Sequence, residues 1–278
     1  MSYKIVVDSC CEIPKEFRGD KRFESVPLGI EVGDYRIMDD DKFDQAEFLQ
    51  KVAECPKGPK SSCPSPERFM EADRAEVDHV YVVTLSSHLS GSYNSAMLGK
   101  NLYLEKYGEK QIHVVDSESA CGGETQIALK LVELEEQGIP FERIVEQIES
   151  FRSSVHTYFV LDNLETLRKN GRLSGVKALV ASTLNIKPIM AGDKGVIVQR
   201  GQSIGIKKAL AKMADMAVEE MSKQGQRTLI VSHCNAPERA EQVKQMILSK
   251  KKFAKVYVND TTGIGSMYSN DGGVVVTV

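Results

Sequence analysis

Short apolar runs alternate with helical patterns through the first half of the chain. The run from His79 to Leu85 is almost entirely β-branched or aromatic, which is typical of a buried strand. Similar runs predict extended segments at 4–8, 23–32 and 112–117. Helical patterns are found at 44–54, 127–137 and 141–151, and another contains Met97, Leu98, Leu102 and Leu104 and is closed by Gly108. Strands that alternate with helices in this way favour an α/β fold with a parallel sheet.

The second half mixes strands and helices less regularly. Strands are predicted at 157–161, 228–232, 256–258 and 274–278, with a hairpin of 186–190 and 195–199. Helices are predicted from Asp162 to the run 168–172, and at 176–184, 206–224 and 237–250. Asp162 is the expected N-cap of the first of these, with Glu165 three residues later as in a capping box. We therefore expect an α+β second domain, with the boundary near 153–157, and divide the chain into domains 1–155 and 156–278.

A serine-rich stretch, Leu85 to Ala96, lies between a predicted strand and a predicted helix. Ser90 stands where the N-cap of that helix is expected. The first N–H groups of a helix have no partner within the helix and attract anions, and Gly91 lets a ligand approach the backbone. The stretch taken alone fits a small-anion site and an ordinary capped turn equally well.

Other serines lie at the predicted carboxyl ends of strands, where open α/β sheets bind ligands. Ser9, Ser86, Ser87, Ser90 and Ser117 share this placement. A further pair, Ser61 and Ser62, comes just before a helix that Ser65 and Pro66 are expected to begin. Their hydroxyls are therefore free for another role, and the serines converge on one rim of the sheet.

Composition narrows the classes of protein. The formal charge of the 278 residues is −3 and there is no Trp, so neither a strong positive field nor base-stacking favours nucleic-acid binding. No apolar run reaches the length of a membrane span, and the apolar stretch at the N-terminus is too short for a signal peptide. The six cysteines form no C-x-x-C pair. We expect a cytoplasmic protein with reduced thiols and with neither a metal nor a cofactor.

Gly201 to Gly205 reads G-Q-S-I-G and matches the nucleophile-elbow pattern of serine hydrolases. Ser203 would be the nucleophile, with Asp215 and His233 as the acid and base that follow in the chain. No H-G-G-G oxyanion loop precedes the motif. A serine hydrolase is thus the alternative function.

Three basic residues, Arg168, Lys169 and Arg172, follow a predicted helix. Their charge suits the negative end of the helix, and it also suits partner docking or a phosphate contact. The pattern leaves both interpretations open.

Taken together, these segments resemble the DegV family of bacterial lipid-binding proteins. The matching segments, over nearly the whole chain, are Asp8-Ser9 with Ile13-Pro14, Ser61 to Pro66 with Phe69, Ser86 to Ala96, Val115-Asp116-Ser117, Leu161 to Ser174, and Asn185 to Ile189.

The resemblance implies a two-domain α/β protein that buries one long-chain fatty acid, with the carboxylate at the domain junction and the acyl chain in the second domain. It implies no catalysis by this chain, which would be the binding subunit of a fatty-acid kinase and would contact membranes transiently to exchange lipid. It assigns head-group hydroxyls to Ser61 and Ser90. Kinase docking falls to Arg168, Lys169 and Arg172 collectively. The expected carboxylate-binding set is Ser61, Ser62, Ser90, Gly91 and Ser266.

The chain departs from the family pattern near its C-terminus. Family members usually carry Gly-x-His-x-Gly-Pro-Gly there, and the histidine reaches the carboxylate. Here Met267 stands at the place of the histidine, within Gly265 to Asn270. Ser266 and Tyr268 are the candidates for the lost donor, and the kinase step is less firmly implied than lipid binding.

Overall fold

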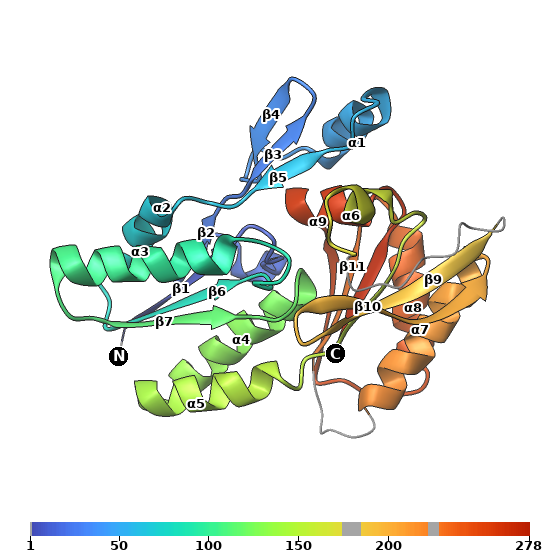
Figure 1. Cartoon of the computed structure of the whole chain (residues 1–278). Helices are drawn as coiled ribbons and strands as arrows, with labels where there is room; N and C mark the ends of the chain where they lie inside the picture. Colours follow the sequence, from blue (N-terminus) through green and yellow to red (C-terminus); the bar gives the residue numbers. More distant parts are fainter. Residues whose placement is uncertain (1, 174–184, 222–227) are drawn as a thin grey trace.

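The first half of the chain forms a parallel sheet covered on both faces. The computed structural model describes residues 2–173, 185–221 and 228–278. The strand order is β2-β1-β6-β7 (Figure 1). In chain order the strands are β1 (Tyr3–Asp8), β2 (Phe23–Val26), β6 (His79–Thr84) and β7 (Gln111–Asp116). The parallel arrangement agrees with the prediction from alternating strands and helices.

Helices pack against each face of this sheet because side chains alternate between faces along a strand. Val6, Val80 and Val82 lie on one face, in a cluster with residues of α2 (Pro66–Asp73) and α3 (Ser92–Tyr107). The other face carries a second cluster, formed with α4 (Gly122–Glu136) and α5 (Phe141–Arg152). Both clusters are largely apolar cores, which hold the carboxyl ends of the strands in fixed positions.

A small lobe, residues 29–62, is inserted between β2 and α2. It contains the antiparallel sheet β4-β3-β5 and one helix, and it projects above the parallel sheet in Figure 1. Its elements are β3 (Gly29–Val32), β4 (Tyr35–Met38), α1 (Gln45–Glu54) and β5 (Lys60–Ser62). The sequence predicted α1 but not this sheet, and it merged β2 with β3 into one segment. Another short element that was not predicted is the 3₁₀ helix Lys15–Phe17.

The second half forms a six-stranded mixed sheet, ordered β10-β9-β8-β13-β11-β12. Its strands are β8 (Thr157–Val160), β9 (Ile186–Asp193), β10 (Val196–Ile204), β11 (Thr228–His233), β12 (Lys255–Asp260) and β13 (Val274–Thr277). Helices α7 (Ile206–Met221) and α8 (Pro237–Leu248) cover one face and share its apolar core. The predicted hairpin and strands are confirmed, whereas the predicted helix 176–184 lies outside the described residues.

Helix α4 of the first half packs directly on the second sheet. Gln126 donates to the carbonyl of Thr228, at the start of β11, at 3.0 Å. A Cβ atom on Gly122 would lie 2.9 Å from Ile230 Cγ2 and 2.9 Å from Thr277 Oγ1. Only a glycine permits this approach, so the two halves are closely interlocked at this point.

Two short helices lie between the small lobe and the second sheet: α6 (Glu165–Lys169) and α9 (Gly263–Ser269). The predicted capping box at Asp162 is wrong, because α6 begins at Glu165 and its N-cap is Leu164. Asp162 instead accepts from Arg239 Nη1 at 2.6 Å. The arrangement brings α9 next to the lobe that precedes it by some two hundred residues.

Along residues 2–173, 185–221 and 228–278, every helix is too short or too polar to cross a lipid bilayer.

Candidate functional site

A pocket lies where the small lobe, the serine loop and the second sheet meet. It encloses about 860 Å³, a volume that includes its open mouth. Ser61, Leu89 and Ser90 line it from the first half, and Phe159, Leu161 and Arg172 line it from the second. The pocket therefore spans the junction of the two halves.

One end of the pocket is polar and carries a positive charge. The hydroxyl of Ser61 lies 3.0 Å from the hydroxyl of Tyr268 on α9. The guanidinium carbon of Arg172 lies 5.8 Å from the centre of the Tyr268 ring. Arg172 is held there because its Nε donates to the carbonyl of Leu89 at 3.0 Å. Ser90 lines the same pocket, so Ser61, Ser90, Arg172 and Tyr268 form what we call the head cluster.

The rest of the pocket wall is mostly apolar. On β8 and the residue that follows it, Thr157, Phe159 and Leu161 line the pocket, while Tyr158 and Val160 are buried in the core under α7. This alternation is the period of a β-strand, with one face in the core and one face on the cavity. Phe159 pairs with Val275 of β13, which lines the pocket too. Leu161 and Leu167 belong to one apolar cluster that Tyr268 joins, so the apolar wall continues into the head cluster.

The serine loop is held by a buried carboxylate at the end of β1. Asp8 accepts from the Ser92 hydroxyl at 2.6 Å and from the backbone N–H of Leu85 at 2.9 Å. Burial raises the pKa of Asp8, and these donors oppose the rise. The N-cap of α3 is Gly91 rather than the predicted Ser90, whose Oγ accepts from Ser92 N at 3.2 Å. Asp8 thus fixes the backbone that presents Ser90 to the pocket.

Three residues of the expected carboxylate-binding set do not line the pocket. Ser62 is exposed, as expected for the neighbour of Ser61 on a strand, and Gly91 is also exposed. Ser266 is fully buried, and its hydroxyl lies 2.8 Å from that of Thr261. Met267, at the place of the family histidine, is 1% exposed and packs in an apolar cluster. Tyr268, the other candidate donor, is the one that reaches the pocket.

The strand-end serines mostly bond within the protein. Ser9 Oγ accepts from the backbone N–H of Leu28 at 3.0 Å. Ser86 donates to the carbonyl of Gly195 at 2.7 Å, and Ser117 donates to that of Ser119 at 3.2 Å. These hydroxyls position loops around the pocket, which explains the serine-rich rim without making each serine a ligand contact.

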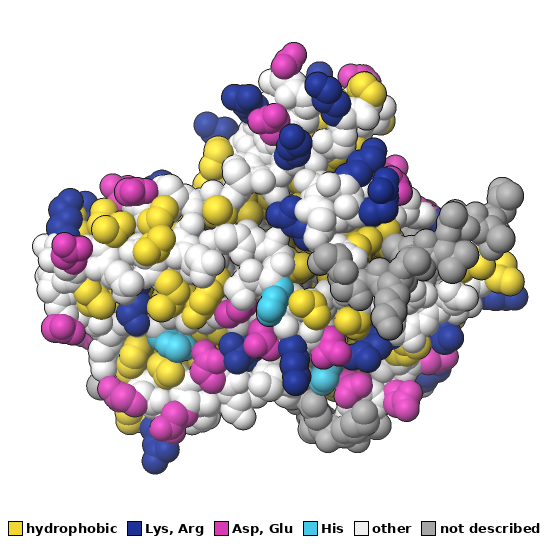
Figure 2. Space-filling view, viewed as in Figure 1, with side chains coloured by type: hydrophobic (Ala, Val, Ile, Leu, Met, Phe, Trp, Pro, Cys, Tyr) yellow, Lys and Arg dark blue, Asp and Glu magenta, His cyan; other side chains and the backbone are white. Residues whose placement is uncertain are grey.

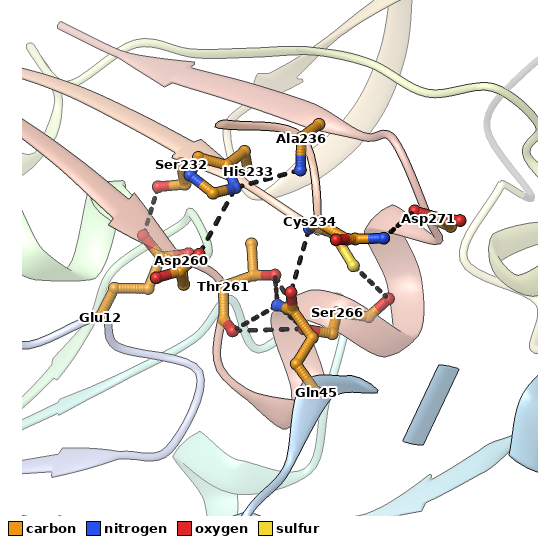
Figure 3. A network of polar contacts seen from close by, with 11 residues as sticks. Glu12, Gln45, Ser232, His233, Cys234, Ala236, Asp260, Thr261, Ser266 and Asp271 are labelled. Atoms are coloured by element: carbon orange, nitrogen blue, oxygen red, sulfur yellow. Dashed lines mark hydrogen bonds and ion pairs between the residues drawn. The ribbon is translucent and has the colours of Figure 1, made fainter. Parts of the chain in front are cut away.

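Two side chains fasten the small lobe to α9. Figure 3 shows Gln45 of α1 beside Thr261 and Ser266, where its Nε2 donates to the Ser266 hydroxyl at 2.9 Å. Asp39 accepts from the backbone N–H groups of Gly263 at 2.7 Å and Ile264 at 2.9 Å. It thereby caps α9, the helix of Tyr268. Burial raises the pKa of Asp39 to about 6.

Arg168 and Lys169 are exposed next to the head cluster rather than in it. Arg168 pairs with Glu165 at 2.7 Å. Lys169 packs beside the loop before β5, because a Cβ on Gly58 would meet its Cδ at 3.3 Å. Lys57 and Lys60 are exposed on that loop and strand, and Figure 2 shows basic side chains gathered over this part of the molecule. We call Lys57, Lys60, Arg168 and Lys169 the basic patch.

The hydrolase alternative is not supported by the geometry. Ser203 lies within β10, paired with Lys187 of β9, and not on a strand-to-helix elbow. His233 is on β11, and three strands separate β10 from β11 in the sheet. At about 4.8 Å between neighbouring strands, the two residues are too far apart for a catalytic pair. The described residues also include no group of three His, Cys, Asp or Glu side chains placed to hold a metal ion.

Sequence reasoning did not place Arg172 in the pocket, and it did not identify the residues of the apolar wall. Arg172 was assigned to docking with its basic neighbours, because sequence shows no difference among three adjacent cations. The alternation of Thr157, Phe159 and Leu161 with buried Tyr158 and Val160 was visible as a strand. It did not show which face borders a cavity.

Comparisons with known proteins find relatives of one family, and the matches extend over nearly the full chain. A family model described as "Uncharacterised protein, DegV family" matches residues 2–278. A DegV domain-containing protein of Streptococcus pyogenes is 36% identical over 281 residues, covering 99% of each chain. The alignment therefore leaves no large segment of either protein unmatched.

Solved structures extend the similarity to the fold. A DegV family protein of Ruminococcus gnavus, described with vaccenic acid, is 50% identical, with a TM-score of 0.97 over 100% of both chains. The Fatty Acid Kinase (Fak) B3 protein of Streptococcus pneumoniae, loaded with linoleic acid, is 31% identical, with a TM-score of 0.86 over 100% of this chain and 99% of that one. The predicted two-part α/β architecture is thereby confirmed.

Proposed function

Because the chain belongs to the DegV family, we propose that it binds one long-chain fatty acid, with the carboxylate at the head cluster and the acyl chain along the apolar wall. The observation that carries this assignment is a single pocket that is polar and cationic at one end and apolar beyond it. Relatives of the same fold are described with vaccenic, heptadecanoic and linoleic acids. The chain acts as a lipid-binding protein and not as an enzyme.

The tail supplies most of the affinity. A chain of sixteen to eighteen carbons, at about 0.8 kcal/mol for each buried CH₂, offers on the order of 10 kcal/mol of transfer free energy. Each hydrogen bond to the carboxylate contributes only about 1.5–3 kcal/mol. The head cluster therefore determines orientation and the choice of head group.

The head cluster offers the donors that a buried carboxylate requires. Ser61, Ser90 and Tyr268 supply hydroxyls, and Arg172 supplies a charge that suits a carboxylate. Tyr268 takes the role that the family histidine has elsewhere, since Met267 has no donor to offer. Ser62, Gly91 and Ser266 lie outside the pocket, and Ser266 supports α9 through its contacts with Thr261 and Gln45.

The decisive experiment is extraction of the purified protein with organic solvent, followed by mass spectrometry. We expect about one long-chain fatty acid per chain. The delipidated protein is then titrated with octadecanoic acid and with octadecanol, and the acid should bind more tightly. A protein that carries no fatty acid and takes up none when delipidated would refute the proposal.

We further propose that the chain presents its fatty acid to a fatty-acid kinase. A neighbour of the same fold is described as a fatty-acid kinase B protein. The basic patch lies beside the head cluster, where a partner that acts on the carboxylate would have to dock. Acyl-phosphate formation, measured with a fatty-acid kinase, ATP and the loaded protein, tests this role.

A cytoplasmic location and transient membrane contact for lipid exchange belong to the same proposal. Fatty acids partition into bilayers, so a carrier has to take its ligand from a lipid surface. Transfer of a fluorescent fatty acid from vesicles should then accelerate with vesicle concentration. A rate independent of vesicle concentration would contradict membrane contact.

A further inference from the structure

Two hydroxyl groups interrupt the apolar wall of the pocket, away from the head cluster. Ser119 and Thr157 both line the pocket, and each is 8% exposed. Their hydroxyl oxygens lie 2.8 Å apart. Thr157 is also 3.3 Å from the hydroxyl of Thr277, which is buried in β13. The three hydroxyls therefore form a buried chain, Thr277–Thr157–Ser119, that ends at the pocket.

This chain has one hydrogen more than it has internal hydrogen bonds. Three hydroxyls carry three hydrogens, and the chain contains two hydrogen bonds. Among the described residues, these three side-chain oxygens have no recorded partner besides one another. If Thr277 donates to Thr157 and Thr157 donates to Ser119, the Ser119 hydrogen remains available. A buried donor without an acceptor is costly, so a ligand that brings an oxygen to this place is favoured.

The register of the second sheet shows how far Thr157 lies from Leu161. Thr157 and Leu161 point to the same side, and Leu161 packs in the cluster that contains Tyr268. Four residues of extended chain span about 13 Å. An extended chain of single bonds advances about 1.2 Å for each bond, so this distance corresponds to about ten or eleven carbons.

The register of the neighbouring strand, β9, places the loop of Ser119 at the same level of the pocket as Thr157. Tyr158 pairs with Ala191 and Phe159 pairs with Met190, so Gly192 of β9 lies near Thr157. A Cβ on Gly192 would meet the backbone oxygen of Glu118 at 3.9 Å, which brings the loop of Ser119 to the same level. Ser119 and Thr157 thus line the pocket at a level beyond Leu161. The Ser119 hydroxyl also packs against the start of α4, since a Cβ on Gly123 would lie 2.0 Å from its oxygen.

We propose that this pocket accepts long-chain fatty acids with an oxygen at mid-chain, a hydroxyl or a keto group at about carbons 10 to 14, and that Ser119 and Thr157 are the specificity-determining residues. The inference rests on the proposed fatty-acid function and adds a ligand class to it. An apolar wall would penalise such an oxygen, because the ligand would lose its hydrogen bonds to water. Here Ser119 donates to it, and Ser119 or Thr157 accepts from it if it is a hydroxyl.

The opposite polarity, with the carboxylate at Ser119, is disfavoured by charge. Glu118 lines this part of the pocket, whereas Arg172 stands at the head cluster. Glu118 is already paired with Arg152, whose Nη2 lies 3.7 Å from its Oε1. A second carboxylate there would compete for this one cation, whereas at the head cluster it meets Arg172. A neutral oxygen on the acyl chain, by contrast, can lie near Glu118 without charge repulsion while the carboxylate lies near Arg172.

The test is competition binding to the delipidated full-length protein. The probes are octadecanoic acid, 12-hydroxyoctadecanoic acid, 12-oxooctadecanoic acid and, as a positional control, 3-hydroxyoctadecanoic acid. We expect the wild type to bind the 12-substituted acids at least as tightly as octadecanoic acid and the 3-hydroxy acid more weakly. If instead the 12-substituted acids bind at least tenfold more weakly than octadecanoic acid, the inference is wrong. If no acid binds, the proposed function itself fails, which is a distinguishable result.

Two variants test whether Ser119 and Thr157 cause the tight binding of the 12-substituted acids. Thr157→Val preserves shape and removes the hydroxyl, and Ser119→Ala removes the terminal donor. Each should lower the affinity ratio of the 12-hydroxy acid to octadecanoic acid about tenfold, with octadecanoic acid itself nearly unchanged. Ser95→Ala is the matched control, since Ser95 is a buried serine of α3 that does not line the pocket. A ratio that is unchanged in both variants, or that falls equally in Ser95→Ala, would overturn the assignment.

Discussion

The hydroxyl oxygens of Ser61 and Tyr268 lie 3.0 Å apart, although 207 positions separate the two residues in the chain. Ser61 belongs to the last strand of the small lobe, and Tyr268 belongs to α9. Arg172 adds a charge from a third segment, above the Tyr268 ring. The head cluster therefore exists only when the small lobe is docked on the second half. Ligand selection and the docking of the lobe are consequently coupled.

Removal of the Ser61 hydroxyl should weaken binding of the acid selectively. In Ser61→Ala, we expect the affinity for octadecanoic acid to fall about tenfold or more, since one hydrogen bond to a charged group is lost. The affinity for octadecanol should fall by a smaller factor. Isothermal titration of the delipidated protein measures both.

Ser62→Ala is the matched control for this experiment. Ser62 is the next residue of the same strand, is exposed and does not line the pocket. Its replacement should leave both affinities within about twofold of the wild type, as is usual for surface positions. Equal losses for acid and alcohol in Ser61→Ala would argue against a head-group role.

Charge reversal in the basic patch should separate lipid binding from partner docking. Arg168→Glu with Lys169→Glu changes two exposed side chains outside the pocket. We expect fatty-acid uptake to remain normal and association with a fatty-acid kinase to fall at least tenfold, with a steep salt dependence in the wild type. Arg143→Glu, on α5 of the first half, is an exposed control. Unimpaired acyl-phosphate formation by the double variant would remove the docking assignment.

Asp39 should stabilise both α9 and the ligand site. Asp39→Asn loses part of the cap on Gly263 and Ile264, and we expect the free energy of unfolding to fall by about 1–2 kcal/mol. Binding of the fatty acid should weaken as well, because α9 carries Tyr268. Urea unfolding and titration calorimetry measure the two effects. Asp40→Asn changes an exposed neighbour and should leave both nearly unchanged; equal losses in the two variants would contradict the capping role.

Buried Glu12 should make the protein less stable as the pH rises. Burial raises the pKa of its carboxyl from 4.5 to about 8, and the hydroxyl of Ser232 donates to Oε2. Between these pH values the folded state holds a proton that the unfolded chain releases. The free energy of unfolding therefore falls with pH, by up to about 1.4 kcal/mol for each pH unit.

Glu12→Gln removes this contribution while keeping the side-chain shape. We expect the stability of the variant, relative to the wild type, to increase steadily from pH 5 to pH 8 in urea unfolding. Glu146→Gln, on the exposed side of α5, provides the control. Parallel pH profiles for Glu12→Gln and the wild type would show that Glu12 is charged in the folded protein.

Much of the fold was readable from local patterns. The strand at Val80 and the helix at Pro66 follow from hydrophobic period and capping chemistry, which act within a few residues. The sheet of the small lobe was missed because its strands are short, and β5 pairs with β3 across about thirty residues of chain. The capping box at Asp162 failed because the carboxylate has a stronger partner in Arg239, far away in sequence.

The site was only partly readable for the same reason. Ser61 and Ser90 were identified through the family motifs, and both line the pocket. Ser266 belongs to the same motif region, but its hydroxyl faces Thr261 and Gln45. The serine hydroxyls are chemically alike, and only the tertiary register determines which of them faces the cavity.

The glycine of α4 that meets Ile230 and Thr277 has a dynamic consequence. Because no side chain separates α4 from the second sheet at this glycine, the two halves are packed too closely to slide past each other. Local opening of the structure is therefore expected in other parts of the molecule. The small lobe is attached through the hydrogen bonds of Gln45, Asp39 and Ser61 on its α9 side and through an apolar cluster that its Ile30 and Phe48 share with Ile264. Hydrogen exchange should accordingly be faster in residues 29–62 than in α4, and a bound fatty acid should slow exchange in the lobe more than anywhere in the parallel sheet.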